Sequence, residues 1–324
     1  MADQTYVITN RVRKRNTYGE DPEPRGGIHF LVAQGRYSKD PGKFRELSLD
    51  QFKNQLLAAL RQKARNGKRA RAAIYIHGYN NTFKDALAEL QEIGTGLARR
   101  GGYDGLVIGF TWPSEGRTLA YLEDRDDARE SVTGFVHLMH LIKAIRMPAE
   151  ECFVDVSMLA HSMGSYLLRE GLNYFWKHMG YPWGDIYFAQ TLMFAADIAY
   201  DSLRNGGSGQ AISSFSHRVT AYYSIHDDIL GLSRGVKHFG ARRLGRSGPA
   251  EYGELPENVV GVDCSRIATP ENAKKFRAGR VHSSYRVIPA ILKEFVATMS
   301  GQDRAAIPNR VEIPGSGRKG YILR

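Results

Sequence analysis

The stretch that decides the fold is VDVSMLAHSMG, residues 154–164. It opens with a compact apolar run, typical of a buried strand, and leads into a segment with helical apolar spacing from Gly164 to Trp176. Ser162 therefore falls where a strand turns directly into a helix. Ala160 and Gly164, two positions before and after the serine, are small enough to let a tight turn pack against its neighbours. The stretch predicts a strand, a sharp turn with a serine at its apex, and a helix.

Apolar strands and amphipathic helices alternate on both sides of this unit. Strands are expected at Tyr6–Thr9, Gly27–Ala33, Ala72–Ile76, Leu106–Trp112, Cys152–Leu159, Phe188–Ala196, Arg218–Ser224 and Val259–Val262. Helices are expected at Leu49–Ala64, Thr82–Ala98, Ala128–Ile145, Gly164–Trp176 and Val287–Met299, with Thr82 as an N-cap. This alternation is typical of a mostly parallel sheet with helices on both faces, so the predicted fold class is α/β.

We expect residues 1–300 to form a single domain. Within it, residues 1–71 would contribute basic N-terminal strands and a helix. The irregular segment 231–257 would form a lid or a surface excursion, because long loops in compact domains tend to be functional or mobile. Residues 301–324 are expected to be a C-terminal appendage.

The composition is that of an ordinary globular protein. Hydrophobic residues make up 42% of the 324 residues and charged residues 24%, which excludes wholesale disorder. Two cysteines, Cys152 and Cys264, are too few for a disulfide scaffold and suit a reducing compartment. No secretory signal is visible, and no run approaches the roughly 18 apolar residues of a membrane span. These features predict a cytoplasmic protein without a membrane span.

The net charge of +11 is unevenly distributed. Basic residues predominate in residues 1–71 and 200–324, whereas the segment between them is acidic. A positive flank can attract an anionic surface, so binding of such a surface through the flanks is one alternative function. No nucleic-acid-binding module is recognisable, and no nucleic-acid partner is expected.

Ser162 is a candidate nucleophile. A serine hydroxyl is weakly nucleophilic, so it needs a tight turn that presents it to a base. The helix that follows offers its N-terminal amides to a developing oxyanion. A turn of this kind at a strand-to-helix junction matches the nucleophile elbow G-x-S-x-G, with alanine in the first place.

The acid and the base follow from chain order and position. Where this elbow occurs, the order is serine, acid, histidine. Asp227 follows the end of a predicted strand, where catalytic groups of parallel sheets gather, and is the expected acid. Asp228 and Asp197 are alternative acids. His282, just before the last predicted helix, is the expected base, with His238 as the alternative.

The segment after the strand Ala72–Ile76 is the expected second half of an oxyanion hole. The backbone amides of Tyr79 and Met163 would stabilise the oxyanion. The pocket is expected to be lined by residues near these amides and at the neighbouring strand ends, namely His77, Gly78, Asn80, Trp112 and His161.

No metal or cofactor is expected. His137 and His140 stand three positions apart on a predicted helix, but the sequence supplies no third ligand with suitable spacing. The G-x-G-x-x-G spacing at residues 315–320 has no helix after it, so it does not predict a phosphate site.

Three motifs together resemble a known family. HGYNNTF (residues 77–83), WPS (112–114) and AHSMG (160–164) are similar to a poorly characterised, mainly bacterial branch of the α/β-hydrolase superfamily, formerly a domain of unknown function. The resemblance implies an α/β-hydrolase fold with roughly eight strands, mostly parallel, the first strands being partly antiparallel. It also implies serine hydrolase chemistry through Ser162, Asp227 and His282, but no particular substrate.

The function expected from these observations is a serine hydrolase that cleaves a carboxylic ester or related acyl bond. It would act on a small-molecule acyl substrate through a covalent acyl-enzyme. A catalytically silent hydrolase-fold binding module is the remaining alternative.

Overall fold

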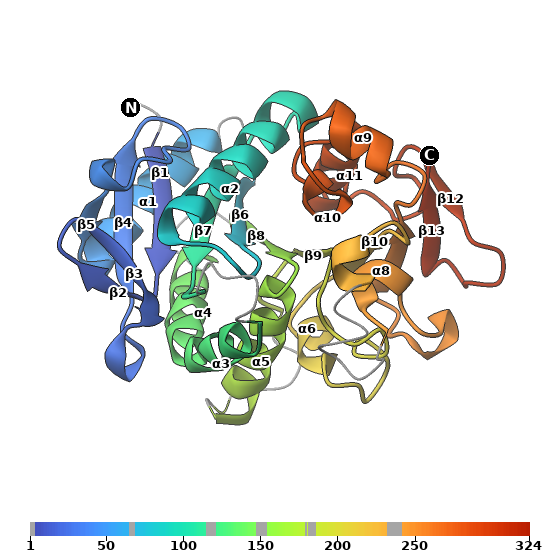
Figure 1. The fold of residues 1–324 in the computed structure, drawn as a ribbon, viewed down its shortest axis with the longest axis horizontal. Helices are drawn as coiled ribbons and strands as arrows, with labels where there is room; N and C mark the ends of the chain where they lie inside the picture. The colour runs from blue at the N-terminus through green and yellow to red at the C-terminus, as the bar shows by residue number, and fades with distance from the viewer. Residues whose placement is uncertain are drawn as a thin grey trace.

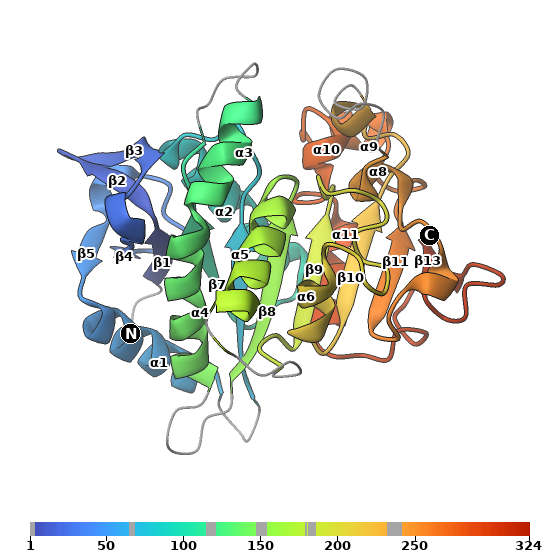
Figure 2. The ribbon, with the colours of Figure 1, turned by 90° about the horizontal axis from the view of Figure 1, so that it is seen from below.

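A sheet of eleven strands runs through the middle of the molecule (Figures 1 and 2), in the order β12-β13-β11-β10-β9-β8-β6-β7-β1-β4-β5. The computed structural model describes residues 4–64, 69–114, 121–146, 154–178, 180, 186–231 and 242–324. The strands of this sheet are β1 (Gln4–Thr9), β4 (His29–Gln34), β5 (Arg45–Leu47), β6 (Ala70–Ile76), β7 (Leu106–Thr111), β8 (Val154–His161), β9 (Gln190–Phe194), β10 (Val219–Tyr223), β11 (Val259–Asp263), β12 (Arg310–Glu312) and β13 (Gly320–Leu323).

Most neighbouring strands in this sheet are parallel. Antiparallel pairing occurs towards the two edges, where β4 pairs with β1 and β5, and β12 pairs with β13. The expected mostly parallel sheet with partly antiparallel first strands is therefore confirmed, but the expected number of eight strands is wrong. The three additional strands, β5, β12 and β13, have three or four residues each, too few to establish an alternating pattern in the sequence.

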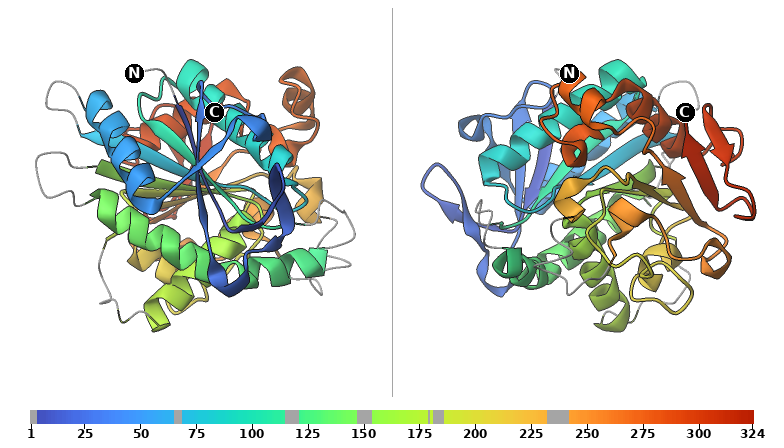
Figure 3. Two further views of the ribbon diagram at one scale, coloured as in Figure 1. Left: turned by 90° about the vertical axis from the view of Figure 1, so that its left-hand side faces the viewer. Right: turned by 45° about the vertical axis from the view of Figure 1, so that its right-hand side comes forward.

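Helices cover both faces of the sheet, as expected (Figure 3). The face with α1, α4 and α5 carries α1 (Leu49–Lys63), α4 (Val132–Arg146), α5 (Gly164–His178), α6 (Gln210–Ser214) and α8 (Leu244–Ser247). The opposite face carries α2 (Phe83–Gly96), the π-helix η3 (Leu97–Gly101), α9 (Pro270–Lys275), α10 (Val281–Ser284) and α11 (Pro289–Met299). Beyond these lie α3 (Tyr121–Glu130) and the short 3-10 turns η1 (Pro24–Gly26), η2 (Pro41–Lys43) and η4 (Tyr252–Glu254).

Alternating side chains of the central strands fill the two cores. In β6, Ile74 and Ile76 pack into the core beneath α1, α4 and α5, whereas Ala73 and Tyr75 pack beneath α2 and α11. These side chains are buried on both faces, which explains why the parallel strands read as continuous apolar runs.

Helix boundaries follow local sequence signals. The Thr82 hydroxyl accepts a hydrogen bond from the Asp85 amide and caps α2, as predicted. The expected helix Ala128–Ile145 is instead two helices, α3 and α4, which meet at the buried Ser131. The helical hydrogen bonding continues through this position, because the Ser131 amide donates to the Asp127 carbonyl (2.8 Å).

A hairpin of β2 (Arg11–Lys14) and β3 (Thr17–Pro22) forms a second, two-stranded sheet that the sequence does not predict. Its strands are polar and lack an apolar alternation. The hairpin is organised around Arg11, whose guanidinium is fully buried and donates to the Glu20 carboxylate and the Gly19 carbonyl. A buried charge with several acceptors replaces the usual apolar core at this point.

The last residues of the chain extend the sheet. Strand β13 pairs in parallel with β11, and Tyr321 and Leu323 are buried in the core shared with α11. Arg310, at the start of β12, forms a buried ion pair with Glu294 of α11. Residues 310–323, which the sequence predicts as part of an appendage, are thus built into the main sheet.

None of the helices in the described parts of the chain has the length and apolarity needed to cross a membrane.

Candidate active site

Ser162 occupies the turn between β8 and α5. Its φ angle of +53° lies in the left-handed region, which residues other than glycine rarely adopt. The Ser162 amide donates to the Phe194 carbonyl (3.1 Å), and the Ser162 carbonyl accepts from the Asp197 amide (3.1 Å). The end of β9 therefore holds the strained turn on both sides.

Two glycines allow the chain to approach this turn closely. A Cβ atom on Gly164 would lie 2.6 Å from the His77 carbonyl oxygen and 2.7 Å from that of Ile76. A Cβ atom on Gly78 would lie 3.0 Å from the Ser162 Cβ. The close packing of α5 on β6 thus depends on the absence of a side chain at Gly164. The close packing of the loop after β6 on Ser162 depends in the same way on Gly78.

Asp227 and His282 form a buried pair. The His282 Nδ1 lies 2.8 Å from the Asp227 Oδ2, and the second carboxylate oxygen accepts from the Leu230 amide (3.1 Å). Because a carboxylate only accepts, Nδ1 carries the proton and Nε2 is left as an acceptor. Burial lowers the pKa of His282, but the charge and hydrogen bond of Asp227 outweigh it and the net pKa is raised.

The alternative acids and the alternative base are placed differently. Asp197 is buried and forms an ion pair with Arg243, with 3.0 Å between Oδ1 and Nε. The side chain of Asp228 is exposed. His238 lies outside the described residues.

Ser162 and His282 line the same cavity, which has a volume of about 260 Å³. It lies at the carboxyl ends of β6, β8 and β10, the edge where parallel sheets place their ligands. The predicted pocket residues Gly78, Asn80 and His161 line it, as does Tyr79. The other lining residues come from α2, from the loop after β6, and from segments next to Asp227 and His282: Asn81, Glu89, Ile229, Arg280 and Ser283.

His77 and Trp112 lie behind the cavity rather than in its lining. Their rings stack with centroids 5.4 Å apart, the Trp112 amide donates to His77 Nε2 (3.1 Å), and the indole donates to the His77 carbonyl (3.0 Å). Burial lowers the pKa of His77 to about 3, so the ring is neutral. These contacts fix the end of β6 against the end of β7, from which the cavity loop departs.

The loop after β6 is anchored at Asn81. The Asn81 amide donates to the Ser114 hydroxyl (2.9 Å), and the buried Arg11 donates to the Asn81 carbonyl (2.7 Å). Asn80, one position earlier, has a φ of +62°. The hairpin that carries Arg11 thus supports the loop that bears Tyr79.

His161 connects the turn at Ser162 to His282. Its Nε2 lies 3.1 Å from the His282 carbonyl oxygen, which only accepts, so Nε2 carries the proton. Its Nδ1 lies 3.3 Å from a guanidinium nitrogen of Arg286, which only donates. Burial and the neighbouring Arg286 lower the pKa of His161 well below its usual value, so the ring stays neutral in this tautomer.

Three ionic residues that no sequence motif marks complete this network. Arg286 pairs with Glu89 of α2 (3.0 Å) and with Glu92 (2.8 Å). Glu89 also accepts from the Tyr75 hydroxyl (2.7 Å). Isolated charged residues on helices give no motif, so only the packing of α2 against the segment after α10 reveals their association.

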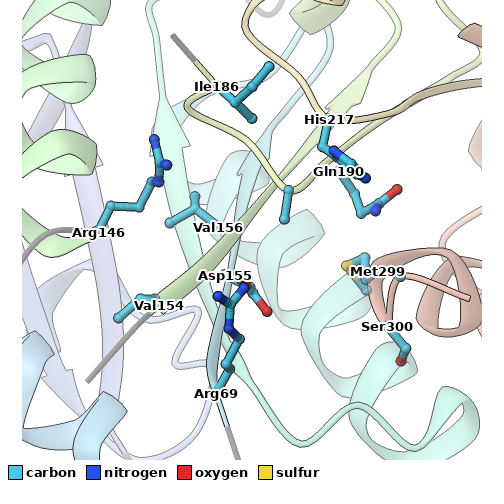
Figure 4. Close-up of a pocket in the computed structure, with 12 residues that line it drawn as sticks. Arg69, Arg146, Val154, Asp155, Val156, Ile186, Gln190, His217, Met299 and Ser300 are labelled. Carbon is cyan, nitrogen blue, oxygen red and sulfur yellow. Dashed lines mark hydrogen bonds and ion pairs between the residues drawn. The ribbon is translucent and has the colours of Figure 1, made fainter. Parts of the chain in front are cut away.

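A second cavity, of about 340 Å³, lies at the opposite ends of the strands (Figure 4). Arg69 and Asp155 approach each other there, with Gln190 and His217 at the far side. None of the predicted site residues lines it. Within the described residues, no cluster of three or more histidine, cysteine or acidic side chains could hold a metal ion.

Comparisons with known proteins agree with this architecture. A model of the family described as "Alpha/beta hydrolase of unknown function (DUF900)" matches residues 52–291. An uncharacterized protein of Nostoc sp. is 39% identical over 245 residues, which cover 64% of this chain and 62% of that protein. The chain thus spans somewhat less than two thirds of the length of this relative.

Two solved structures show distant similarity. The phospholipase PlaB from Legionella pneumophila in complex with thio-NAD has 15% sequence identity and a TM-score of 0.30, over 55% of this chain and 44% of that one. An esterase of Pyrobaculum calidifontis has 12% identity and a TM-score of 0.36, over 94% and 86% of the two chains.

Proposed function

Because the chain belongs to the α/β-hydrolase family of unknown function, as its motifs predicted, we propose that it is a serine hydrolase cleaving a carboxylic ester or related acyl bond. Family membership supports a hydrolase in general. The finer proposal is carried by one observation, the 2.8 Å contact between Asp227 and His282 in a site where His282 and Ser162 line one cavity. A nucleophile, a base and an orienting acid are the minimal parts of acyl transfer.

In the first half of the reaction, Ser162 is acylated. His282 Nε2 takes the proton from the Ser162 hydroxyl as its oxygen attacks the carbonyl carbon of the substrate. Asp227 holds the ring in the required tautomer and stabilises the imidazolium that forms. The amides of Tyr79 and Met163 stabilise the oxyanion, and His282 then gives its proton to the leaving alcohol.

In the second half, water releases the acyl group. His282 takes a proton from the water, whose oxygen attacks the acyl carbon, and returns the proton to Ser162 as the bond to the serine breaks. The acid product leaves and the enzyme is restored.

Hydrolysis of a series of p-nitrophenyl esters, graded by acyl chain length, tests this proposal. Replacing Ser162 by alanine should lower kcat by at least about 10⁴-fold, because the triad acts as a unit. Ser165→Ala is a matched control, since this buried hydroxyl lies one helical turn away and donates to the Ala160 carbonyl (3.2 Å). A folded Ser162→Ala protein with substantial residual turnover would rule out Ser162 as the nucleophile.

A further inference from the structure

The fold brings basic side chains from three distant parts of the chain to one groove of about 720 Å³. Arg36 and Lys39 come from the loop after β4, and Arg99 and Arg100 from the π-helix η3. Arg277 follows α9 and Arg286 precedes α11. The groove therefore combines the basic N-terminal flank, the acidic middle and the basic C-terminal third of the sequence.

Carboxylates do not balance these cations. Glu92 is the one acidic residue in the groove lining, and it already pairs with Arg286, which is buried and pairs with Glu89 as well. Arg100 donates to the Val287 carbonyl (2.5 Å). The remaining cations of the lining are exposed, namely Arg36, Lys39, Arg99 and Arg277. None of these four side chains forms an ion pair within the parts of the chain that the structure describes.

The groove is held in shape by specific packing. The Gln91 side chain donates to the Tyr37 carbonyl (3.0 Å), and a Cβ on Gly94 would lie 2.6 Å from the Tyr37 ring. The loop that carries Arg36 and Lys39 is therefore fixed against α2. On the other side, a Cβ on Gly96 would lie 2.9 Å from the Arg286 carbonyl oxygen, so α2 also packs closely on that segment.

Local backbone features place two of the exposed arginines. A π-helix rather than an α-helix ends the α2 segment, and Arg99 lies within it. Arg277 has a φ of +58°, a conformation that arginine rarely adopts. Like charges held close together on rigid elements raise the free energy of the protein unless an anion binds between them.

We propose that this groove binds a ligand carrying two or more phosphate groups. Several cations call for a multiply charged anion, and the planar guanidinium fork matches the geometry of phosphate. The volume is that of a small-molecule site, and Thr95, Gln91 and the half-buried Phe276 supply uncharged contacts in the same lining. The proposal does not depend on the hydrolase chemistry.

Calorimetric titration of the full chain with inorganic tripolyphosphate, at low and at physiological salt, tests the proposal directly. The double variant Arg99→Gln, Arg277→Gln should bind at least about tenfold more weakly, because two charge-assisted contacts are lost. The control is Arg61→Gln, Arg204→Gln, which removes the same charge from positions associated with the opposite face of the sheet. This control should keep the wild-type affinity.

A second arm identifies the source of the phosphates. Sedimentation with vesicles of neutral lipid, with or without phosphatidylinositol bisphosphate, is compared for the same three proteins. If tripolyphosphate binds the wild type and the control but not the Arg99→Gln, Arg277→Gln variant, the result supports a soluble ligand. Binding of the phosphoinositide vesicles alone, lost in the same variant, supports a lipid headgroup. The absence of both, or equal losses in the two double variants, would overturn the proposal.

Discussion

At the scale of single residues, the site depends on hydrogen bonds that select one tautomer of each neutral histidine. His282 donates to Asp227, and His161 donates to the His282 carbonyl while accepting from Arg286. In each histidine the partner on one nitrogen determines what the other can do. The neutral His161 thus holds the backbone of His282, the residue that we propose as the base.

Asp227→Asn tests the proposed acid. We expect it to lower kcat by about 10³- to 10⁴-fold, because the amide no longer selects the tautomer of His282 that leaves Nε2 as an acceptor. Asp228→Asn is the matched control, since that side chain is exposed next in sequence, and it should change kcat little. Steady-state ester hydrolysis measures both, and the reverse ranking of the two variants would exclude Asp227.

The pH profile of activity tests the electrostatics of His282, the proposed base. His282 must be neutral to accept a proton, so kcat/KM should rise with pH through the pKa of His282 in the free enzyme. Asp227 is the main group that raises this pKa, so the acidic limb should lie above the ordinary value of 6.5. In Asp227→Asn the limb should move to lower pH. An unchanged limb would mean that another group titrates.

His161 is expected to position the base rather than to touch the substrate. His161→Phe retains an aromatic ring but cannot donate to the His282 carbonyl, and we expect kcat to fall by about 10- to 100-fold with little change in KM. His161→Gln can still donate and should recover part of the loss. Equal effects of both variants on kcat, with a shared loss of thermal stability, would indicate a purely structural residue.

At the scale of elements, the strands, helices and loops around the site pack unusually closely at two glycines. Helix α5 can start directly on β6 because Gly164 has no side chain, and the neighbouring loop lies against Ser162 through Gly78. At Gly164 the nearest atoms are backbone carbonyl oxygens, which cannot move aside as a side chain would, whereas Gly78 faces the side chain of Ser162.

Gly164→Ala should therefore destabilise the protein. The added Cβ overlaps two carbonyl oxygens, and we expect a loss of about 1–3 kcal/mol in the free energy of unfolding, with a loss of activity. Gly253→Ala is the control, because nothing lies within 4 Å of its Cβ position and its φ is not positive. Chemical denaturation compares the two, and equal stabilities would contradict this account of the turn.

The elements also explain what the sequence could predict. The buried parallel strands are mostly apolar, and those runs predict β6 to β11 from the sequence. Strand β5 and the polar hairpin β2–β3 carry no such pattern, because their stability comes from pairing with distant residues and from the buried Arg11. For the site, chain order and the elbow pointed to Ser162, Asp227 and His282, whereas the network of Arg286 and Glu89 depends on contacts nearly 200 positions apart.

At the scale of the whole molecule, one sheet joins regions that differ sharply in charge and in sequence pattern. Its edges are formed by the N-terminal strands on one side and by β12 and β13 on the other (Figure 1). Since β13 buries Tyr321 and Leu323 in the core with α11, the end of the chain should unfold together with the rest.

Leu323→Ala tests this integration. The side chain is 1% exposed, and its truncation should cost about 2–4 kcal/mol in the global free energy of unfolding. Arg318→Ala, an exposed position in the same segment, should cost little. If Leu323→Ala left global unfolding unchanged, the last residues would form a separate appendage.

The most direct test of the central claim is labelling of the wild-type protein with a fluorophosphonate probe, beside Ser162→Ala, with the modified peptide mapped by mass spectrometry. This account predicts a single modified residue, Ser162, and no labelling of the folded alanine variant, because only an activated serine hydroxyl attacks the phosphonate. Labelling elsewhere, or no labelling of the folded wild-type protein, would contradict it and favour a hydrolase fold that binds without turnover.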